Sequence, residues 1–157
     1  RGDIDRAKDL ISDPNIAYRY ELWKSTLENL KPEGYAIATS VNELQKAIDE
    51  AQEILAHKHE REMQDLLDDE KQLGIKTGIR SQLEATHKRE IRRFRTDELE
   101  FGFSILTTIF QEQLRSKPDE GSLQAVNIIK KANRVMKRNT NEKLLLTSLL
   151  ISLSELN

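Results

Sequence analysis

Residues 74–78, Gly-Ile-Lys-Thr-Gly, separate two long stretches of helical periodicity. Glycines at both ends of this segment mark a turn. Apolar residues recur at spacings of three and four from Leu44 to Leu55, and a mostly charged helical stretch continues to Leu73. A second helical stretch runs from about Ile79 to Arg115. A chain that reverses at this turn brings the two stretches together. The sequence therefore predicts a long antiparallel helical hairpin over residues 41–115.

Four further helices are expected outside the hairpin, at about residues 3–11, 14–30, 122–137 and 141–156. Asp13 and Pro14 suit the start of the second of these helices. Ser40 and Glu43 have the spacing of a capping box, which places the start of the first hairpin helix at Ser40. No segment alternates apolar and polar residues as a half-buried strand does. The predicted fold class is an all-α helical bundle with a long hairpin.

The composition favours half-exposed helices over a sandwich or a barrel, since 33% of the residues are charged and 37% are apolar. With a net charge of -2, the whole chain lacks the overall positive charge that is typical of nucleic-acid-binding proteins. The absence of cysteine excludes disulfides and thiolate metal sites. No apolar run approaches the roughly 20 residues of a membrane span, and residues 1–10 have no apolar centre of a secretory signal. A cytoplasmic location is expected. Because the chain opens directly on a helix start, we expect it to be part of a longer protein.

The two arms of the hairpin carry opposite charge. With the turn centred near Lys76, Asp65 is expected opposite His87, and Glu60 opposite Arg92. Residues 60–70 of the outgoing arm are rich in carboxylates, and residues 80–95 of the returning arm are rich in cations. The basic run at residues 87–95 is either a phosphate-binding patch or a solvated face paired with the acidic arm. The matching distance of the acidic segment from the turn favours the second interpretation.

Motifs that carry chemistry are incomplete or absent. His57 and His59 are two residues apart, so they point to different faces of a helix and cannot chelate one metal ion together. Glu84 and His87 have the Glu-x-x-His form of di-iron bundles, but those sites need two such motifs and two more carboxylates. Glycine-rich phosphate loops and a serine elbow are also missing. No catalytic, cofactor-binding or metal-binding residue is therefore assigned, and no enzyme activity is expected.

Four segments resemble one family. Residues 2–10, Gly-Asp-Ile-Asp-Arg-Ala-Lys-Asp-Leu, resemble the start of the helical lid of AAA-type clamp-loader subunits. Residues 138–150, Arg-Asn-Thr-Asn followed by a leucine-rich run, resemble the last helix of the family's collar domain. The Glu-Ala-x-x-Lys-Arg-Glu-Ile-Arg-Arg segment and the apolar stretch at 99–114 resemble the first collar helices. The resemblance implies that residues 1–34 are part of the lid, and that residues 35–157, hairpin included, are a collar bundle.

The resemblance also implies a role in DNA replication. Collar domains hold the ring of a clamp loader together, so the implied partners are the other loader subunits, gamma/tau and delta. DNA would be contacted only indirectly and a membrane not at all, and the isolated chain is expected to be a monomer. Motor subunits place an arginine at the fourth position of the lid motif, where this chain has Asp5. A carboxylate there would repel a triphosphate, so nucleotide sensing is not expected.

The candidate subunit-interface residues are the polar ones beside the last two helices: Arg134, Lys137, Arg138, Asn139 and Asn141. For the two asparagines, simple helix capping is the favoured alternative. Two other functions stay open: a nucleic-acid-binding module that uses residues 87–95, and a coiled-coil adaptor. The assembly role predicts that the helix at 144–156 packs with the fifth helix and with residues 99–114. An adaptor would expose its leucines to a partner helix.

Overall fold

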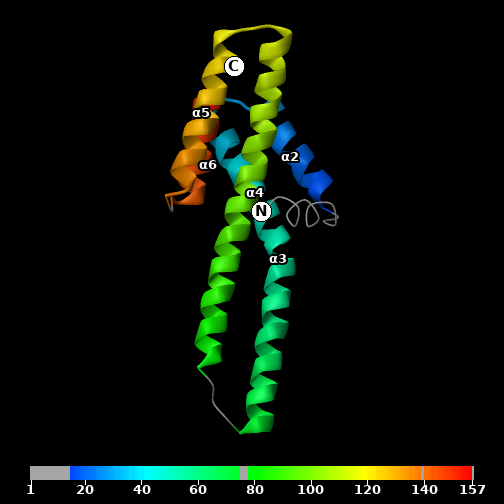
Figure 1. The fold of residues 1–157 in the computed structure, drawn as a ribbon. Coiled ribbons are helices and arrows are strands. Elements are labelled where there is room, and N and C mark those ends of the chain that lie inside the picture. The colour runs from blue at the N-terminus through cyan, green and yellow to red at the C-terminus, as the bar shows by residue number, and fades with distance from the viewer. Residues whose placement is uncertain (1–14, 75–77, 139, 157) are drawn as a thin grey trace. The chain divides into compact units, whose positions relative to one another are not determined.

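The computed structural model describes residues 15–74, 78–138 and 140–156. These residues form five helices and no strand, which confirms the all-α fold (Figure 1). The helices are α2 (Ile16–Glu28), α3 (Gly34–Leu73), α4 (Ile79–Ser116), α5 (Glu120–Met136) and α6 (Glu142–Ser154). The helix expected at residues 3–11, its Asp5, and the start signal at Asp13 and Pro14 lie outside the described residues.

The start of α3 differs from the expected one. The helix begins at Gly34, six residues before Ser40, and the amide of Ile37 donates to the carbonyl of Glu33. The reason is burial, since Ile37, Val41 and Leu44 continue one apolar stripe and are all buried. The backbone amides at Ser40–Glu43 lie inside the helix and need no capping side chain. Burial of the apolar stripe therefore determines where the helix starts.

The chain divides into two compact units. The bundle consists of the described parts of Arg1–Ala47 and Leu99–Asn157, and the hairpin unit is Ile48–Glu98. In this division α2 belongs to the bundle, together with the described part of the segment assigned to a lid. The assignment of residues 1–34 to a separate lid stays a prediction.

In the bundle, α2 packs closely on α4 through Trp23 and Gly102. A Cβ atom built on Gly102 would lie 2.0 Å from Cε2 of the Trp23 ring, so only glycine leaves room for the indole. The ring of Phe103 meets Trp23 edge to face, with centroids 6.1 Å apart. Both aromatic side chains are almost fully buried. This contact attaches α2 to the bundle core.

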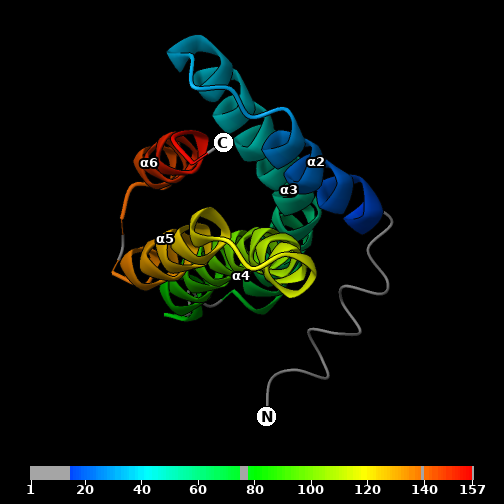
Figure 2. The same ribbon diagram turned by 90° about the horizontal axis from the view of Figure 1, so that it is seen from above.

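Helices α4 and α5 run antiparallel, as two polar contacts show. Lys137 Nζ lies 3.4 Å from a carboxylate oxygen of Glu100, and the hydroxyl oxygen of Ser122 lies 3.4 Å from the side-chain carbonyl oxygen of Gln113. Helix α6 packs beside α5 (Figure 2). Its inward residues are buried: Leu145, Leu146, Leu149, Leu150 and Leu153. The leucine-rich helix is therefore part of the bundle core.

The hairpin unit is antiparallel. Arg95 on α4 donates to Asp49 Oδ1 over 2.6 Å and to Gln52 Oε1 over 3.0 Å, both on α3. Helix α3 ends at Leu73 and is followed by Gly74 with φ +65°. Glycine is favoured at this left-handed position because it has no Cβ. In the described part of the chain, no helix is long and apolar enough to cross a membrane.

Candidate interaction site on the bundle

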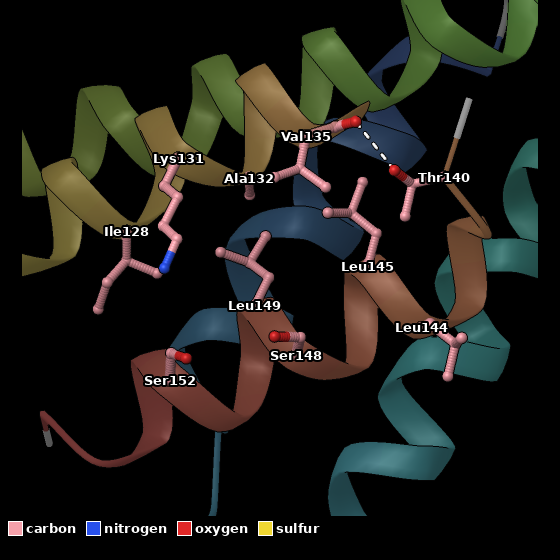
Figure 3. A pocket seen from close by; sticks show the side chains of 10 residues that line it. All are labelled: Ile128, Lys131, Ala132, Val135, Thr140, Leu144, Leu145, Ser148, Leu149 and Ser152. Carbon is pink, nitrogen blue, oxygen red and sulfur yellow. Dashed lines mark hydrogen bonds between the residues drawn. The ribbon is translucent and has the colours of Figure 1, made fainter. Parts of the chain in front are cut away.

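A groove of about 310 Å³ lies between α5 and α6 (Figure 3). Its apolar lining comes from both helices: Ile128, Ala132, Val135, Leu144, Leu145 and Leu149. Lys131, Thr140, Ser148 and Ser152 complete the walls. Apolar surface with a few polar groups at the edge is typical of a binding groove.

The local sequence explains why the groove stays open. On α5, Ile129 and Ala132 point into the core, whereas Ile128 and Val135 lie on the flank and are only half-buried. On α6, Ser148 and Ser152 occupy the matching flank and are too small to fill the space beside Leu145 and Leu149. Ile128 and Val135 of α5 are therefore left only half covered.

The connector between the two helices closes one end of the groove. The hydroxyl of Thr140 donates to the carbonyl of Val135 over 2.9 Å, which the close-up shows as a dashed line (Figure 3). Asn141 is the N-cap of α6, and its side-chain oxygen accepts from the amide of Leu144 over 3.1 Å. These contacts fix where α6 starts, and hence the width of the groove.

The surroundings of the groove are strongly basic. Residues 127–143 contain one carboxylate, Glu142, and six cationic side chains: Lys130, Lys131, Arg134, Lys137, Arg138 and Lys143. All six cationic side chains are exposed. Leu144 is 67% exposed at the groove, which is unusual for a leucine so close to a packed core. An apolar centre with a charged rim is the common anatomy of a protein interface.

The structure places four of the five candidate interface residues around the α5–α6 connector. Arg134 lies exposed in the last turn of α5, Arg138 is exposed just after it, and Lys137 pairs with Glu100. Asn141 caps α6, which confirms the capping role favoured for it. Asn139 lies outside the described residues. None of the four described side chains lines the groove itself.

Sequence reasoning missed the groove lining. The exposed Leu144, together with Ser148 and Ser152, was a usable signal, since these residues form a separate face of α6 at helical spacing. A leucine run that surrounds most of a helix hides this distinction. Which leucines stay uncovered depends on the neighbouring helix.

A second unusual cluster lies inside the hairpin unit. The rings of His59 and His87 stack with centroids 3.9 Å apart and planes 10° from parallel. His59 Nε2 lies 2.8 Å from Glu90 Oε2, and His87 Nε2 lies 2.9 Å from Glu62 Oε2. A carboxylate cannot donate, so each Nε2 carries the hydrogen. Both rings are buried, so a polar layer crosses the hairpin.

This layer corrects the expected register. His87 faces His59 and Glu62 instead of Asp65. Residues of α4 therefore pair with residues of α3 that come earlier in the chain than a turn centred at Lys76 implies. The hydrogen bond from His87 lowers the pKa of Glu62 below its ordinary value, and the charge of Lys58 acts in the same direction. The polar layer thus selects one register of the hairpin.

The other histidine and the Glu-x-x-His motif do not converge on a common point. His57 is exposed beside Glu60, as expected for a residue on a different face from His59. Glu84 is exposed and accepts from Arg80 over 3.1 Å, while His87 points into the hairpin. Among the residues that the structure describes, no group of three or more His, Cys, Asp or Glu side chains could hold a metal ion.

The basic run at 87–95 divides between two faces of α4. His87 and Arg95 interact with α3, as the charge-pairing interpretation expects. Four cationic residues instead lie exposed on the remaining surface of the helix: Lys88, Arg89, Arg92 and Arg93. The interpretation of this run as a face paired across the hairpin is therefore only partly right, because the register places Glu62 and Glu90 against histidines.

Comparison with protein-family models, with curated proteins and with solved structures finds no match for this chain.

Proposed function

We propose that this chain is a non-catalytic assembly region that holds neighbouring subunits together. The observation that carries the proposal is the apolar groove between α5 and α6, with an exposed leucine at its edge and cations around it. Interfaces of this kind bind through a small apolar centre, and the charged surroundings select the partner and speed its approach.

The complex is proposed from the sequence resemblance. The residues at 2–10 and 138–150 resemble lid and collar segments of a clamp loader, and the role fits the non-motor delta-prime subunit of bacterial DNA polymerase III. The partners would then be the gamma/tau and delta subunits in the cytoplasm, within a DNA-directed DNA polymerase holoenzyme. DNA would be reached through the complex.

Burial in the bundle favours assembly through the groove over a free coiled-coil adaptor. An adaptor needs an uncovered leucine stripe, but Leu146, Leu150 and Leu153 are each at most 1% exposed. The exposed part of α6 is instead the face that contains Leu144, Ser148 and Ser152. A partner side chain inserted beside Leu144 would cover this face without opening the core.

Reconstitution tests the proposal. The chain is mixed with purified gamma/tau and delta subunits and separated by size-exclusion chromatography with light scattering. Co-migration with those subunits, and competition with full-length delta-prime for them, are expected. A chain that neither co-migrates nor competes would exclude the clamp-loader role.

A further inference from the structure

The exposed cations of α4 form a compact surface within the hairpin unit, the basic stripe, defined as Lys88, Arg89, Arg92 and Arg93. The side of α4 that contacts α3 contains Leu83, His87 and Phe94, which are buried or half-buried. At about 100° per residue, positions 88, 89, 92 and 93 lie on the opposite side of the helix. The stripe therefore faces away from the acidic helix α3.

Few contacts inside the chain neutralise these charges. Arg93 Nε lies 3.8 Å from Asp97, and Arg89 donates to the hydroxyl of Thr86 over 3.2 Å. Both partners lie on α4 itself, and both cationic side chains stay exposed. Within the described part of the chain, the side chains of Lys88 and Arg92 make no hydrogen bond or ion pair. Four like charges are thus held within roughly 8 Å of helix axis, at a cost in repulsion that a polyanion would relieve.

The stripe differs from the groove on the bundle in lacking an apolar anchor. The large hydrophobic side chains that are exposed in the described chain include none between residues 80 and 122. Protein partners usually bind through a buried apolar or aromatic contact, whereas a phosphate backbone needs only cations. Three of the four residues are arginines, whose guanidinium groups match phosphate oxygens in pairs.

We propose that the basic stripe of α4 is a docking surface for the phosphodiester backbone of nucleic acid, bound without sequence preference. This inference goes beyond the assembly role, since it uses a different unit of the chain and needs no other subunit. Four contacts give weak binding that is lost steeply as salt rises.

The test measures fluorescence anisotropy of a labelled 30-base-pair duplex and a labelled single strand of the same length with the 157-residue chain, from 50 to 300 mM salt. Log affinity for the duplex is expected to fall against log salt with a slope of about -3 to -4, because each phosphate contact contributes about -0.9. The variant K88Q/R89Q/R92Q/R93Q is expected to bind at least tenfold more weakly at 50 mM salt.

Two matched variants make the result specific. K31Q/K71Q/R115Q/K117Q removes the same charge from exposed positions outside the stripe and is expected to bind within threefold of the wild type. R89K/R92K/R93K keeps the charge and is expected to retain most of the binding. Circular dichroism checks that each variant is helical, and the lysine variant keeps the test valid if the glutamine variant unfolds.

Four outcomes would overturn the proposal. The first is no binding by the wild type at 50 mM salt, and the second is equal binding by the wild type and the stripe variant. The third is an equal loss of binding in the K31Q/K71Q/R115Q/K117Q control. The fourth is displacement of the duplex by polyglutamate when its carboxylate concentration equals the phosphate concentration of a competing unlabelled duplex. The last outcome would assign the stripe to an acidic protein surface.

Discussion

At the scale of single residues, the bundle depends on the absence of one side chain. The indole of Trp23 occupies the space where a Cβ of residue 102 would be, so α2 and α4 can approach only with glycine there. Gly102 is helical and its φ is not positive, so a special backbone conformation does not explain why glycine is needed there. The close packing of Trp23 explains it.

Gly102→Ala should lower the free energy of unfolding by about 1–3 kcal/mol, since the added methyl forces the Trp23 ring or the helix to move. Gly34→Ala is the matched control, because a Cβ there meets nothing within 4 Å. Urea unfolding followed by circular dichroism measures both. Equal stability of the two variants would contradict the packing argument.

The stacked histidines are the second feature at this scale. Replacing both His59 and His87 by leucine should leave stability unchanged or raise it by about 1–3 kcal/mol, since the hairpin then has no buried polar layer. His87→Leu alone should lower the free energy of unfolding by about 1–2 kcal/mol. The variant loses the ring that stacks on His59 and the hydrogen bond from His87 Nε2 to Glu62 Oε2.

Urea unfolding of His59→Leu, His87→Leu and the double variant gives the coupling between the two rings. His57→Ala is the exposed control and should lie within about 0.5 kcal/mol of the wild type. A double variant less stable than either single one would show that the layer contributes more than register.

At the scale of helices, α5 has a titratable start. Asp119 is its N-cap: Oδ1 accepts from the amide of Ser122 over 2.8 Å, and Oδ2 accepts from the Ser122 hydroxyl over 2.6 Å. These hydrogen bonds lower the pKa of Asp119 below its ordinary value of 3.8, the hydroxyl contributing most. The ionised carboxylate therefore stabilises the folded state.

A lowered pKa fixes the direction of the pH effect. The contribution of Asp119 is fully present above pH 3.8 and is lost as the pH falls through the lower, folded-state pKa. Asp119→Asn keeps a capping oxygen but no charge. The melting temperature of this variant should lie below that of the wild type at pH 7, and the difference should shrink as the pH falls below 3.8 and through the lower, folded-state pKa. A gap that stays constant with pH would refute the charged cap.

Periodicity in the sequence was enough to predict most of the helices. The second hairpin helix was expected at 79–115 and spans Ile79–Ser116, and the two last helices start within two residues of their expected positions. The predicted start of α3 was wrong because a local capping pattern was given more weight than the apolar stripe that includes Ile37 and Val41. The hairpin register was wrong because it depends on which side chains pack between the helices, which charge patterns do not specify.

The site was harder to predict than the fold. Charge indicated the C-terminal end of α5, where Arg134 and Arg138 lie, but gave no sign of the apolar groove beside it. The groove depends on the small Ser148 and Ser152 of α6 and on the half-buried Ile128 and Val135 of α5, and these residues come together only once the two helices are packed.

At the scale of the molecule, the bundle has its own buried core, so we expect the isolated chain to fold without a partner. We expect a monomer in size-exclusion chromatography with light scattering at micromolar concentration, since one groove of about 310 Å³ offers too little apolar area for a stable pair. A stable dimer that survives dilution would instead indicate that copies of this chain cover the groove for each other.

The central claim is that the α5–α6 groove holds a neighbouring subunit, and one affinity measurement tests it. Leu144→Lys places a charge at the edge of the groove, and Leu123→Lys makes the same change at another exposed leucine, 53% exposed, that does not line it. Binding of each variant to the gamma/tau and delta subunits is measured by competition with the wild-type chain. We expect at least a tenfold loss of affinity, about 1.4 kcal/mol, for Leu144→Lys and little change for Leu123→Lys. Equal affinities for both variants and the wild type would contradict it.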